Sequence, residues 1–187
     1  QDIEKIESAS LHAREVIKKL LVFARQMPPE KTQVNLDQVV EETLDFFEAR
    51  GAEIGIEVEC SLSRDLPEIT ADPAQLNQVL VNLVVNALQA MPEGGKLTVR
   101  TRACENDVSL IVEDTGTGMS EDVQEQIFVP FFTTKDVGEG TGLGLPVVHG
   151  IVTSHGGSIQ VESKLGRGTR FEIRLPVEGS QSVKENG

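Results

Sequence analysis

Apolar and polar residues follow one another along the first part of the chain with the spacing of an amphipathic helix. Between residues 3 and 27 the apolar side chains recur three and four positions apart, and Pro28 and Pro29 follow directly. Because proline cannot continue a helix, we predict one long helix that ends there. A single helix cannot bury its own wide apolar face, so we expect it to pack in a helical bundle or a coiled coil.

Four further stretches have helical periodicity, and capping or turn residues mark their boundaries. Asn35 or Asp37 can cap the first of them, and Gly51 is expected to end it. Asp72 supplies an N-cap for the next, and Pro73 suits its first turn. The four predicted helices are residues 36–50, 73–91, 121–128 and 143–155, and residues 131–142 between the last two form a predicted loop.

Alternating polar and apolar residues predict five strands, at residues 53–60, 96–104, 107–114, 158–164 and 169–176. Helices interleaved with hairpins indicate an α+β fold, a two-layer α/β sandwich in which helices cover one face of a mixed sheet. The expected organisation is a bundle helix over residues 1–27, a linker over 28–35, one domain over 36–176 and a disordered tail over 177–187.

The predicted helix at residues 73–91 carries no charged side chain, which is unusual for a helix of a water-soluble protein. Beside its apolar face, Gln78, Asn82 and Asn86 lie four positions apart and therefore form one stripe. Carboxamides donate and accept hydrogen bonds without the desolvation cost of an ion, and their oxygens suit a hard cation such as Mg²⁺. The stripe therefore indicates either a half-buried polar binding surface or a helix buried by neighbouring loops, and by itself it does not decide between them.

Three glycine-bearing segments favour the binding surface. They are VEDTGTGM at residues 112–119, GEGTGLGL at 138–145 and GRGT at 166–169. Glycine lets the backbone approach a ligand closely, and N–H groups before a helix can bind phosphate oxygens. Each segment alone is a weak signal, since a hairpin turn needs Gly166 and Gly168 anyway. A dinucleotide-binding fingerprint fits poorly, because GTGLG follows a predicted loop and not a strand.

Composition narrows the classes of function. The formal net charge of −13 and the absence of Trp and Tyr argue against a nucleic-acid binder. No apolar run approaches 18 residues, and no signal peptide opens the sequence. A start without Met suggests a piece of a longer protein, which leaves a membrane anchor elsewhere in the parent open. Cys60 and Cys104 lie in strand-like runs and are expected to be reduced core residues of a cytoplasmic protein.

Five motifs occur in an order that resembles the catalytic and ATP-binding domain of sensor histidine kinases. NLVVNA, DTGTGM, FVPFFTTK, GTGLGL and GxGT are similar to the N, G1, F, G2 and G3 boxes of that family, and the similarity runs from about residue 32 to residue 176. FARQ, at the end of the first predicted helix, resembles the end of the second helix of the dimerisation and phosphotransfer domain, particularly in nitrogen-regulator-type members.

The resemblance implies a Mg²⁺–ATP site and assigns roles within it. Asn86 is expected to bind the Mg²⁺ with Asn82 near the phosphates, and Asp114 to accept the adenine amino group. Residues 131–142 become an ATP lid with Phe131 and Phe132 as its hinge, and Lys135 either reaches the phosphates or stays solvated. The implied ATP-binding residues are Asn82, Asn86, Asp114, Gly116, Gly118, Met119, Phe132, Lys135, Gly140, Thr141, Gly142, Leu143, Gly144, Leu145 and Thr169.

The same resemblance implies a phosphoacceptor that the sequence does not contain. No histidine is followed by the acid and the Asn or Thr with Pro that mark the family's H box, and we interpret His12, His149 and His155 as structural or solvated. The chain is therefore expected to bind Mg²⁺–ATP and to phosphorylate a supplied domain without phosphorylating itself. Related ATPases carry an acid where Asn82 stands, and an amide cannot deprotonate water at neutral pH, which favours phosphoryl transfer over hydrolysis.

The implied partners are a response-regulator receiver domain and a second copy of the full-length protein, joined through the N-terminal helical bundle. Neither nucleic acid nor direct membrane contact is expected for this part. Two alternatives stay open at this point. One is a serine kinase of the anti-sigma-factor type or an ATPase of the same fold, and the other is a non-catalytic, nucleotide-dependent interaction module.

Overall fold

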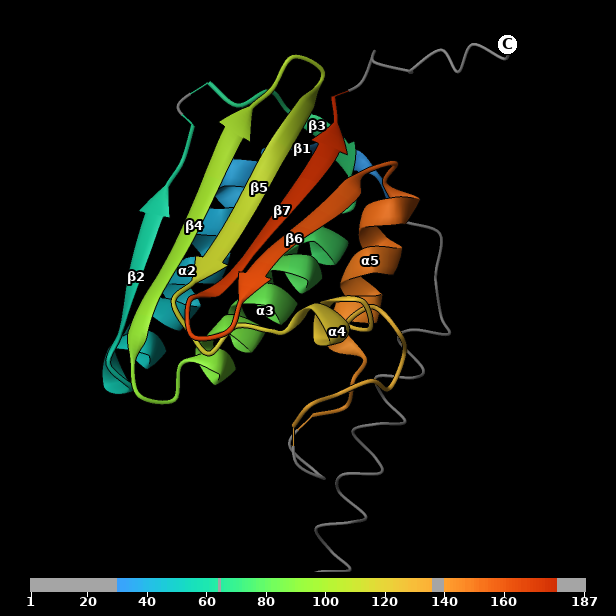
Figure 1. Cartoon of the computed structure of the whole chain (residues 1–187). Helices are drawn as coiled ribbons and strands as arrows, with labels where there is room; N and C mark the ends of the chain where they lie inside the picture. Colours follow the sequence, from blue (N-terminus) through green and yellow to red (C-terminus); the bar gives the residue numbers. More distant parts are fainter. Residues whose placement is uncertain (1–29, 64, 136–139, 178–187) are drawn as a thin grey trace, which may run out of the picture.

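A computed structural model describes residues 30–63, 65–135 and 140–177. Five strands form one sheet in the order β2-β4-β5-β7-β6 (Figure 1). β2 runs parallel to β4, and the other neighbours are antiparallel, so the sheet is mixed as predicted. The strands are β2 (Ile56–Ser61), β4 (Gly95–Ala103), β5 (Asp107–Asp114), β6 (Ser158–Lys164) and β7 (Gly168–Pro176).

The helices cover one face of this sheet, which confirms the predicted two-layer α+β fold (Figure 1). They are α2 (Leu36–Glu53), α3 (Pro73–Ala90), α4 (Glu121–Gln124) and α5 (Gly144–Ser154). Alternate residues of the central strands point into the core, among them Val108 and Leu110 of β5 and Ile173 of β7. They meet the apolar face of α3, where Leu80, Leu83 and their neighbours are buried. The described part of the chain holds no helix with the length and apolar character that crossing a bilayer requires.

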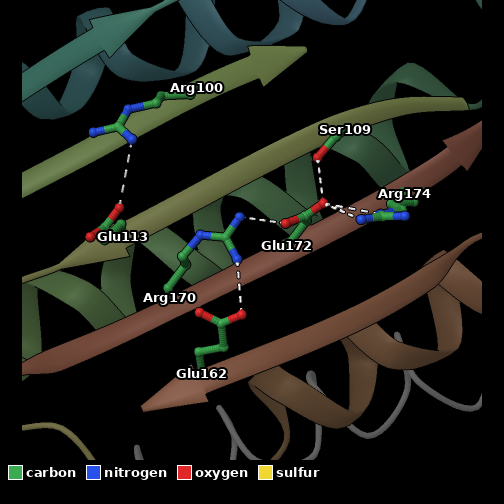
Figure 2. A network of polar contacts seen from close by, with 7 residues as sticks. All are labelled: Arg100, Ser109, Glu113, Glu162, Arg170, Glu172 and Arg174. Atoms are coloured by element: carbon green, nitrogen blue, oxygen red, sulfur yellow. Dashed lines mark hydrogen bonds and ion pairs between the residues drawn. The ribbon is translucent and has the colours of Figure 1, made fainter. Parts of the chain in front are cut away.

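The other face of the sheet is covered by long charged side chains (Figure 2). Glu172 of β7 is 9% exposed and accepts hydrogen bonds from Arg170, from Ser109 Oγ at 3.3 Å and from Arg174 Nε at 3.0 Å. The hydrogen bond from Arg170 is the main reason that the pKa of Glu172 lies below its ordinary value. Ile111, next to Glu172 across the ladder, is only 2% exposed on this face. The aliphatic stems of the charged side chains thus protect the open face of the sheet.

The start of α2 agrees with the prediction, and its end does not. Asn35 is the N-cap, and its Oδ1 accepts the N–H groups of Asp37 at 2.9 Å and Gln38 at 3.3 Å. Gly51 does not end the helix, which continues to Glu53. A Cβ on Gly51 would lie 3.2 Å from Val58 Cγ2, so this glycine allows α2 to approach β2 closely.

Two other predictions about elements are corrected by the structure, and two lie outside the residues that it describes. The predicted linker contains β1 (Thr32–Val34), which pairs with β3 (Ile69–Ala71) in a separate two-stranded sheet. Strands of three residues are too short to show an alternating pattern. The helix predicted at residues 121–128 is the shorter α4, followed by turns. Residues 1–29 and 178–187, which include the predicted bundle helix and nearly all of the predicted tail, lie outside the described residues.

Both cysteines are exposed, so the prediction that they are core residues is wrong. Cys60 lies on β2, the edge strand of the sheet, and Cys104 lies beyond the end of β4 in a turn. An alternating pattern shows that a segment is a strand, but it does not show whether the strand lies at an edge or where it ends.

The capping of α3 gives a testable prediction. Asp72 Oδ1 accepts the N–H groups of Ala74 at 2.9 Å and Gln75 at 3.2 Å, and its Oδ2 accepts the N–H of Glu30 at 3.0 Å. Asp72→Ala should lower the free energy of unfolding by about 1–2 kcal/mol, because the first turn of α3 loses its acceptor. Urea denaturation measures this, and Asp72→Asn, which keeps Oδ1, should retain most of the stability. Equal stability of the Ala variant and the wild type would contradict the prediction.

Candidate functional site

A cavity of about 510 Å³ opens between α3, the loop after β5, the first half of β7 and the start of α5. The stripe of α3 faces it, since Gln78, Asn82 and Asn86 all line it. So do nearly all the other residues singled out from the sequence: Asp114, Gly118, Met119, Phe132, Lys135, Gly140, Thr141, Gly142, Leu143, Gly144, Leu145 and Thr169. Among the implied ATP-binding residues Gly116 is the exception, and it lies against Ala90 at the end of α3.

The carboxamides of α3 fall into two groups with different partners. Asn77 does not face the cavity, and its Nδ2 donates to Thr43 Oγ1 of α2 at 3.0 Å. Asn77 therefore serves the contact between α3 and α2. Asn82 and Asn86 donate no hydrogen bond to the described protein and are half-buried at the cavity. Their amides are left to interact with whatever enters it.

The first turn of α5 lies directly against this stripe. A Cβ placed on Gly144 would be 3.4 Å from Asn82 Oδ1 and 3.9 Å from Asn86 Nδ2. The N-cap of α5, Leu143, makes no side-chain cap hydrogen bond, so the N–H groups of the first turn are not used by a capping residue. Uncapped N–H groups and the positive end of the helix dipole favour an anion at this position. The anion would at the same time touch two carboxamides.

Asp114 lies at the end of β5 and forms the polar part of the cavity wall. Its Oδ1 accepts the N–H of Gly116 at 2.8 Å and the N–H of Thr169 at 3.3 Å. Its Oδ2 accepts no hydrogen bond from the described residues. The side chain is 6% exposed, and burial raises the pKa of Asp114 above its ordinary value, although the two N–H donors partly oppose the shift. This carboxyl group thus presents one fixed acceptor to a ligand.

Glycine is required in the loop after β5 because other backbone passes very close to it. A Cβ on Gly116 would lie 2.4 Å from the carbonyl oxygen of Ala90, at the end of α3. Gly118 has φ +63°, and a Cβ there would lie 2.0 Å from the carbonyl oxygen of Lys164 in β6. The loop is therefore fixed between α3 and the β6–β7 hairpin. Gly116 acts through Asp114 and not as a lining residue.

The segment after α4 closes one side of the cavity. Phe132 lines it, and the N–H of Phe131 donates to the carbonyl of Gly142 at 2.9 Å. Phe131 has φ +69° and is the one non-glycine residue with positive φ among the described residues. Lys135 donates to Gln89 Oε1 at the end of α3. The two ends of the predicted lid, residues 131–142, therefore meet at one place beside α3.

The apolar wall of the cavity was not predicted from the sequence. It includes Val123 and Ile127, which follow one another at helical spacing near α4, and Phe171 of β7. The four-residue spacing of the first two was visible in the sequence, but only the fold shows that they line the cavity while also packing against the core. An apolar wall with a few convergent polar groups is typical of a site for a small organic ligand.

A metal ion at this site would have amide oxygens as protein ligands. No group of three His, Cys, Asp or Glu side chains that could enclose a metal ion exists within the described ranges. Asn82 and Asn86 offer hard oxygen donors beside the anion-binding helix end. Such a sparse donor set suits Mg²⁺, which keeps several waters and shares the oxygens of a bound phosphate.

Neither of the two histidines that the structure describes lines the cavity. His155 is buried, its Nε2 accepts the N–H of Asp72 at 3.0 Å, and its Nδ1 lies 2.9 Å from the carbonyl of Ile151. These contacts fix the orientation of the ring, which ties α5 to the start of α3. His149 is exposed, with its ring centroid 5.2 Å from that of Phe128. His12 lies outside the described residues.

The comparisons with known proteins agree on one family. Residues 71–179 match the family model described as histidine kinase-, DNA gyrase B- and HSP90-like ATPase. The chain is 43% identical over 190 residues to the sensor kinase CckA of Brucella abortus (strain 2308), and the alignment covers 94% of this chain and 20% of that relative. The chain therefore spans about a fifth of the length of this relative.

Two solved proteins are similar in structure. Full-length ShkA in complex with AMPPNP superimposes with a TM-score of 0.79 at 30% identity, over 88% of this chain and 36% of that one. The catalytic domain of the histidine kinase ThkA gives a TM-score of 0.71 at 35% identity, over 79% of this chain and 95% of that one. ThkA in complex with the response regulator TrrA gives 0.75 at 29% identity, over 94% of this chain and 49% of that one.

The raised pKa of Asp114 gives a prediction about stability. Asp114→Asn keeps an oxygen for the N–H groups of Gly116 and Thr169 and removes a desolvated charge. Because the carboxyl pKa is higher in the folded than in the unfolded chain, ionisation costs stability above that pKa. The variant should therefore have a higher melting temperature than the wild type at pH 7, and the difference should close as the pH falls through the raised pKa.

Thermal unfolding between pH 4 and pH 8 measures this difference, with the exposed Glu105→Gln as a charge-matched control that should show no such gain. A lower melting temperature of Asp114→Asn at every pH would contradict the prediction. The same substitution replaces the acceptor that faces the cavity with a donor, so ligand binding should be lost while stability rises.

Proposed function

Since the chain belongs to the family of histidine kinase-, DNA gyrase B- and HSP90-like ATPases and carries the catalytic domain of a sensor histidine kinase, we propose that its cavity binds Mg²⁺–ATP. We further propose that the domain transfers the γ-phosphoryl group to a histidine which these 187 residues do not supply. The phosphoryl group would then pass to a response-regulator receiver domain.

One observation carries this proposal. The first turn of α5 has no capping side chain, and a Cβ placed on Gly144 in this turn would lie 3.4 Å from Asn82 Oδ1. Asp114 lines the same cavity. Phosphate oxygens suit the helix end, and an amino group suits the acceptor of Asp114. ATP is a ligand with both groups on one molecule. Guanine has a carbonyl where adenine has its amino group. Its oxygen would face the carboxylate oxygen of Asp114, and two hydrogen-bond acceptors repel each other.

Asn86 is proposed to hold the Mg²⁺, with Asn82 beside it near the phosphates. When bound, the ion would neutralise charge that develops on the phosphates during transfer. The chain's own part is to position the nucleotide. The amides of α5 hold its anionic end, the rigid loop after β5 holds its base, and Phe132 and Lys135 of the lid segment exclude water from one side.

The residues of the site favour transfer to an acceptor over steady hydrolysis. Within the described cavity wall, the ionisable side chains are Asp114 and Lys135, and neither lies on the stripe beside the helix end. Asn82 occupies that place, and an amide cannot take a proton from water at neutral pH. A nucleophile that is already basic, such as an imidazole brought by another domain, needs no such base.

The proposed partners rest on a similar structure and on the apolar spacing of residues 3–27. A response regulator is bound to the histidine kinase ThkA in one of the similar structures, which supports a receiver domain as the next acceptor for this protein. We further propose that the full-length protein is a homodimer through an N-terminal helical bundle, to which residues 1–27 contribute, and that this part of it works in the cytoplasm. The apolar spacing of residues 3–27 supports the bundle.

Asn86→Ala tests the nucleotide site. The change should reduce the affinity for ATP in the presence of Mg²⁺ by at least tenfold, because the metal loses its protein ligand, and should change affinity much less when EDTA is present. Asn77→Ala is a matched control on the same helix, since Asn77 bonds to Thr43 and does not line the cavity. Calorimetry gives both affinities. Equal effects of the two substitutions would contradict the assignment.

The transfer reaction has its own test. We expect the purified chain, mixed with labelled ATP and an isolated histidine-containing phosphotransfer domain, to phosphorylate that domain with a bond that acid hydrolyses and alkali does not. The chain alone should remain unlabelled and should hydrolyse ATP slowly. Acid-stable label would indicate a serine kinase, and tight ATP binding with no label on any acceptor would indicate an interaction module.

A further inference from the structure

Ser163 of β6 lies behind the cavity wall and does not line the cavity, yet it contacts two residues that do. Its Oγ accepts the N–H of Met119 at 2.8 Å and lies 2.9 Å from Thr169 Oγ1. It also lies 3.0 Å from the carbonyl oxygen of Gly168. The hydroxyl group thus joins the loop after β5 to the start of β7.

These three contacts can all be hydrogen bonds in only one arrangement of protons. The N–H of Met119 can only donate, and the carbonyl of Gly168 can only accept. Ser163 has a single proton, and the Gly168 carbonyl must receive it. The hydroxyl of Thr169 must then donate its own proton to the remaining lone pair of Ser163. All three groups are satisfied, and none of the protons points into the cavity.

The consequence concerns what Thr169 presents to a ligand. Thr169 is 6% exposed and lines the cavity, and its N–H donates to Asp114 Oδ1 at 3.3 Å. With its proton committed to Ser163, its hydroxyl oxygen offers only lone pairs to the cavity. Asp114 Oδ2 offers lone pairs as well. Two neighbouring acceptors suit a group with two N–H donors, and they repel a carbonyl at the same position.

We infer that Ser163 is a positioning residue that sets the selectivity for the nucleobase, by holding Thr169 as a hydrogen-bond acceptor and so excluding purines with a C6 carbonyl. The inference rests on the proposed nucleotide site and adds a determinant to it. Without the Ser163 hydroxyl, the proton of Thr169 is free to turn toward the cavity. The wall then offers a donor, which a C6 carbonyl can accept.

The test compares ATP with inosine triphosphate, which has a carbonyl in place of the 6-amino group and the same ribose and phosphates. Calorimetry with Mg²⁺ gives both dissociation constants for the 187-residue chain and its variants. Ser163→Ala should reduce the ratio of ATP affinity to inosine triphosphate affinity by about tenfold, the equivalent of one hydrogen bond. Ser163→Thr, which keeps the hydroxyl, should restore the wild-type ratio.

Gln124→Ala provides the matched control. Gln124 Nε2 donates to the carbonyls of Met119 at 3.3 Å and Ser163 at 3.1 Å, so its loss loosens the same junction without touching Thr169. Both affinities should fall together in this variant, with the ratio unchanged. If Ser163→Ala behaves in the same way, its role is only structural and the inference is wrong.

If Ser163→Ala does not fold, a second variant tests the inference instead. Thr169→Val preserves the shape of the side chain and removes its acceptor, so the ratio should fall because ATP affinity falls and inosine triphosphate affinity does not. An unchanged ratio in Thr169→Val would overturn the inference. Failure of the proposed function is distinguishable, since a wild-type chain that binds neither nucleotide would refute the site itself.

Discussion

The packing of α3 on the sheet and beside α5 is the interaction on which both the fold and the site depend. One face of this helix buries Leu76, Leu80, Leu83 and their neighbours against the strands. Each such side chain contributes roughly 1.5–3 kcal/mol through burial. The adjoining stripe meets the first turn of α5 at Gly144. Because the core fixes how α3 is rotated, it also fixes where Asn82 and Asn86 point, so the hydrophobic core and the polar site cannot be changed independently.

The same constraint explains why α3 carries no charge. A Lys on the stripe would be half-buried beside the positive end of the α5 dipole, which disfavours a cation, and a Glu would occupy the place that this helix end offers to a phosphate; either ion would also be partly desolvated. Amides avoid that cost and still bind metal and phosphate. Asp114 is the exception, since its charge is buried and its pKa is raised. Two backbone N–H groups hold its carboxylate. The buried charge lowers the stability of the fold, at a place where an acceptor with a fixed direction is useful for binding.

The sequence predicted what depends on local chemistry. Asn35 and Asp72 cap helices as their positions indicate, and the four-residue spacing places Asn82 and Asn86 on one stripe. Predictions were wrong where tertiary context decides. Gly51 resembles a helix end, but it allows close packing of α2 on β2, and Cys60 lies on a strand whose place at the edge only the topology reveals. The contact between Ser163 and Thr169 spans a hairpin, and the cross-strand register creates it. No sequence motif shows which residues of the two strands lie opposite each other.

The two ends of the cavity differ in how their atoms are held, and this difference bears on selectivity. Asp114, Thr169 and Ser163 belong to paired strands, and each is fixed by main-chain hydrogen bonds, so their acceptors hold their positions before a ligand arrives. The opposite side is closed through Phe131, whose left-handed conformation costs of order 1–2 kcal/mol and is held by one hydrogen bond to Gly142. A ligand that rearranges this side can release that strain, whereas a base that mismatches the paired strands cannot be accommodated by small shifts. We therefore expect the residues of the sheet to discriminate between bases. The segment that contains Phe131 is expected to adapt its conformation to the phosphates.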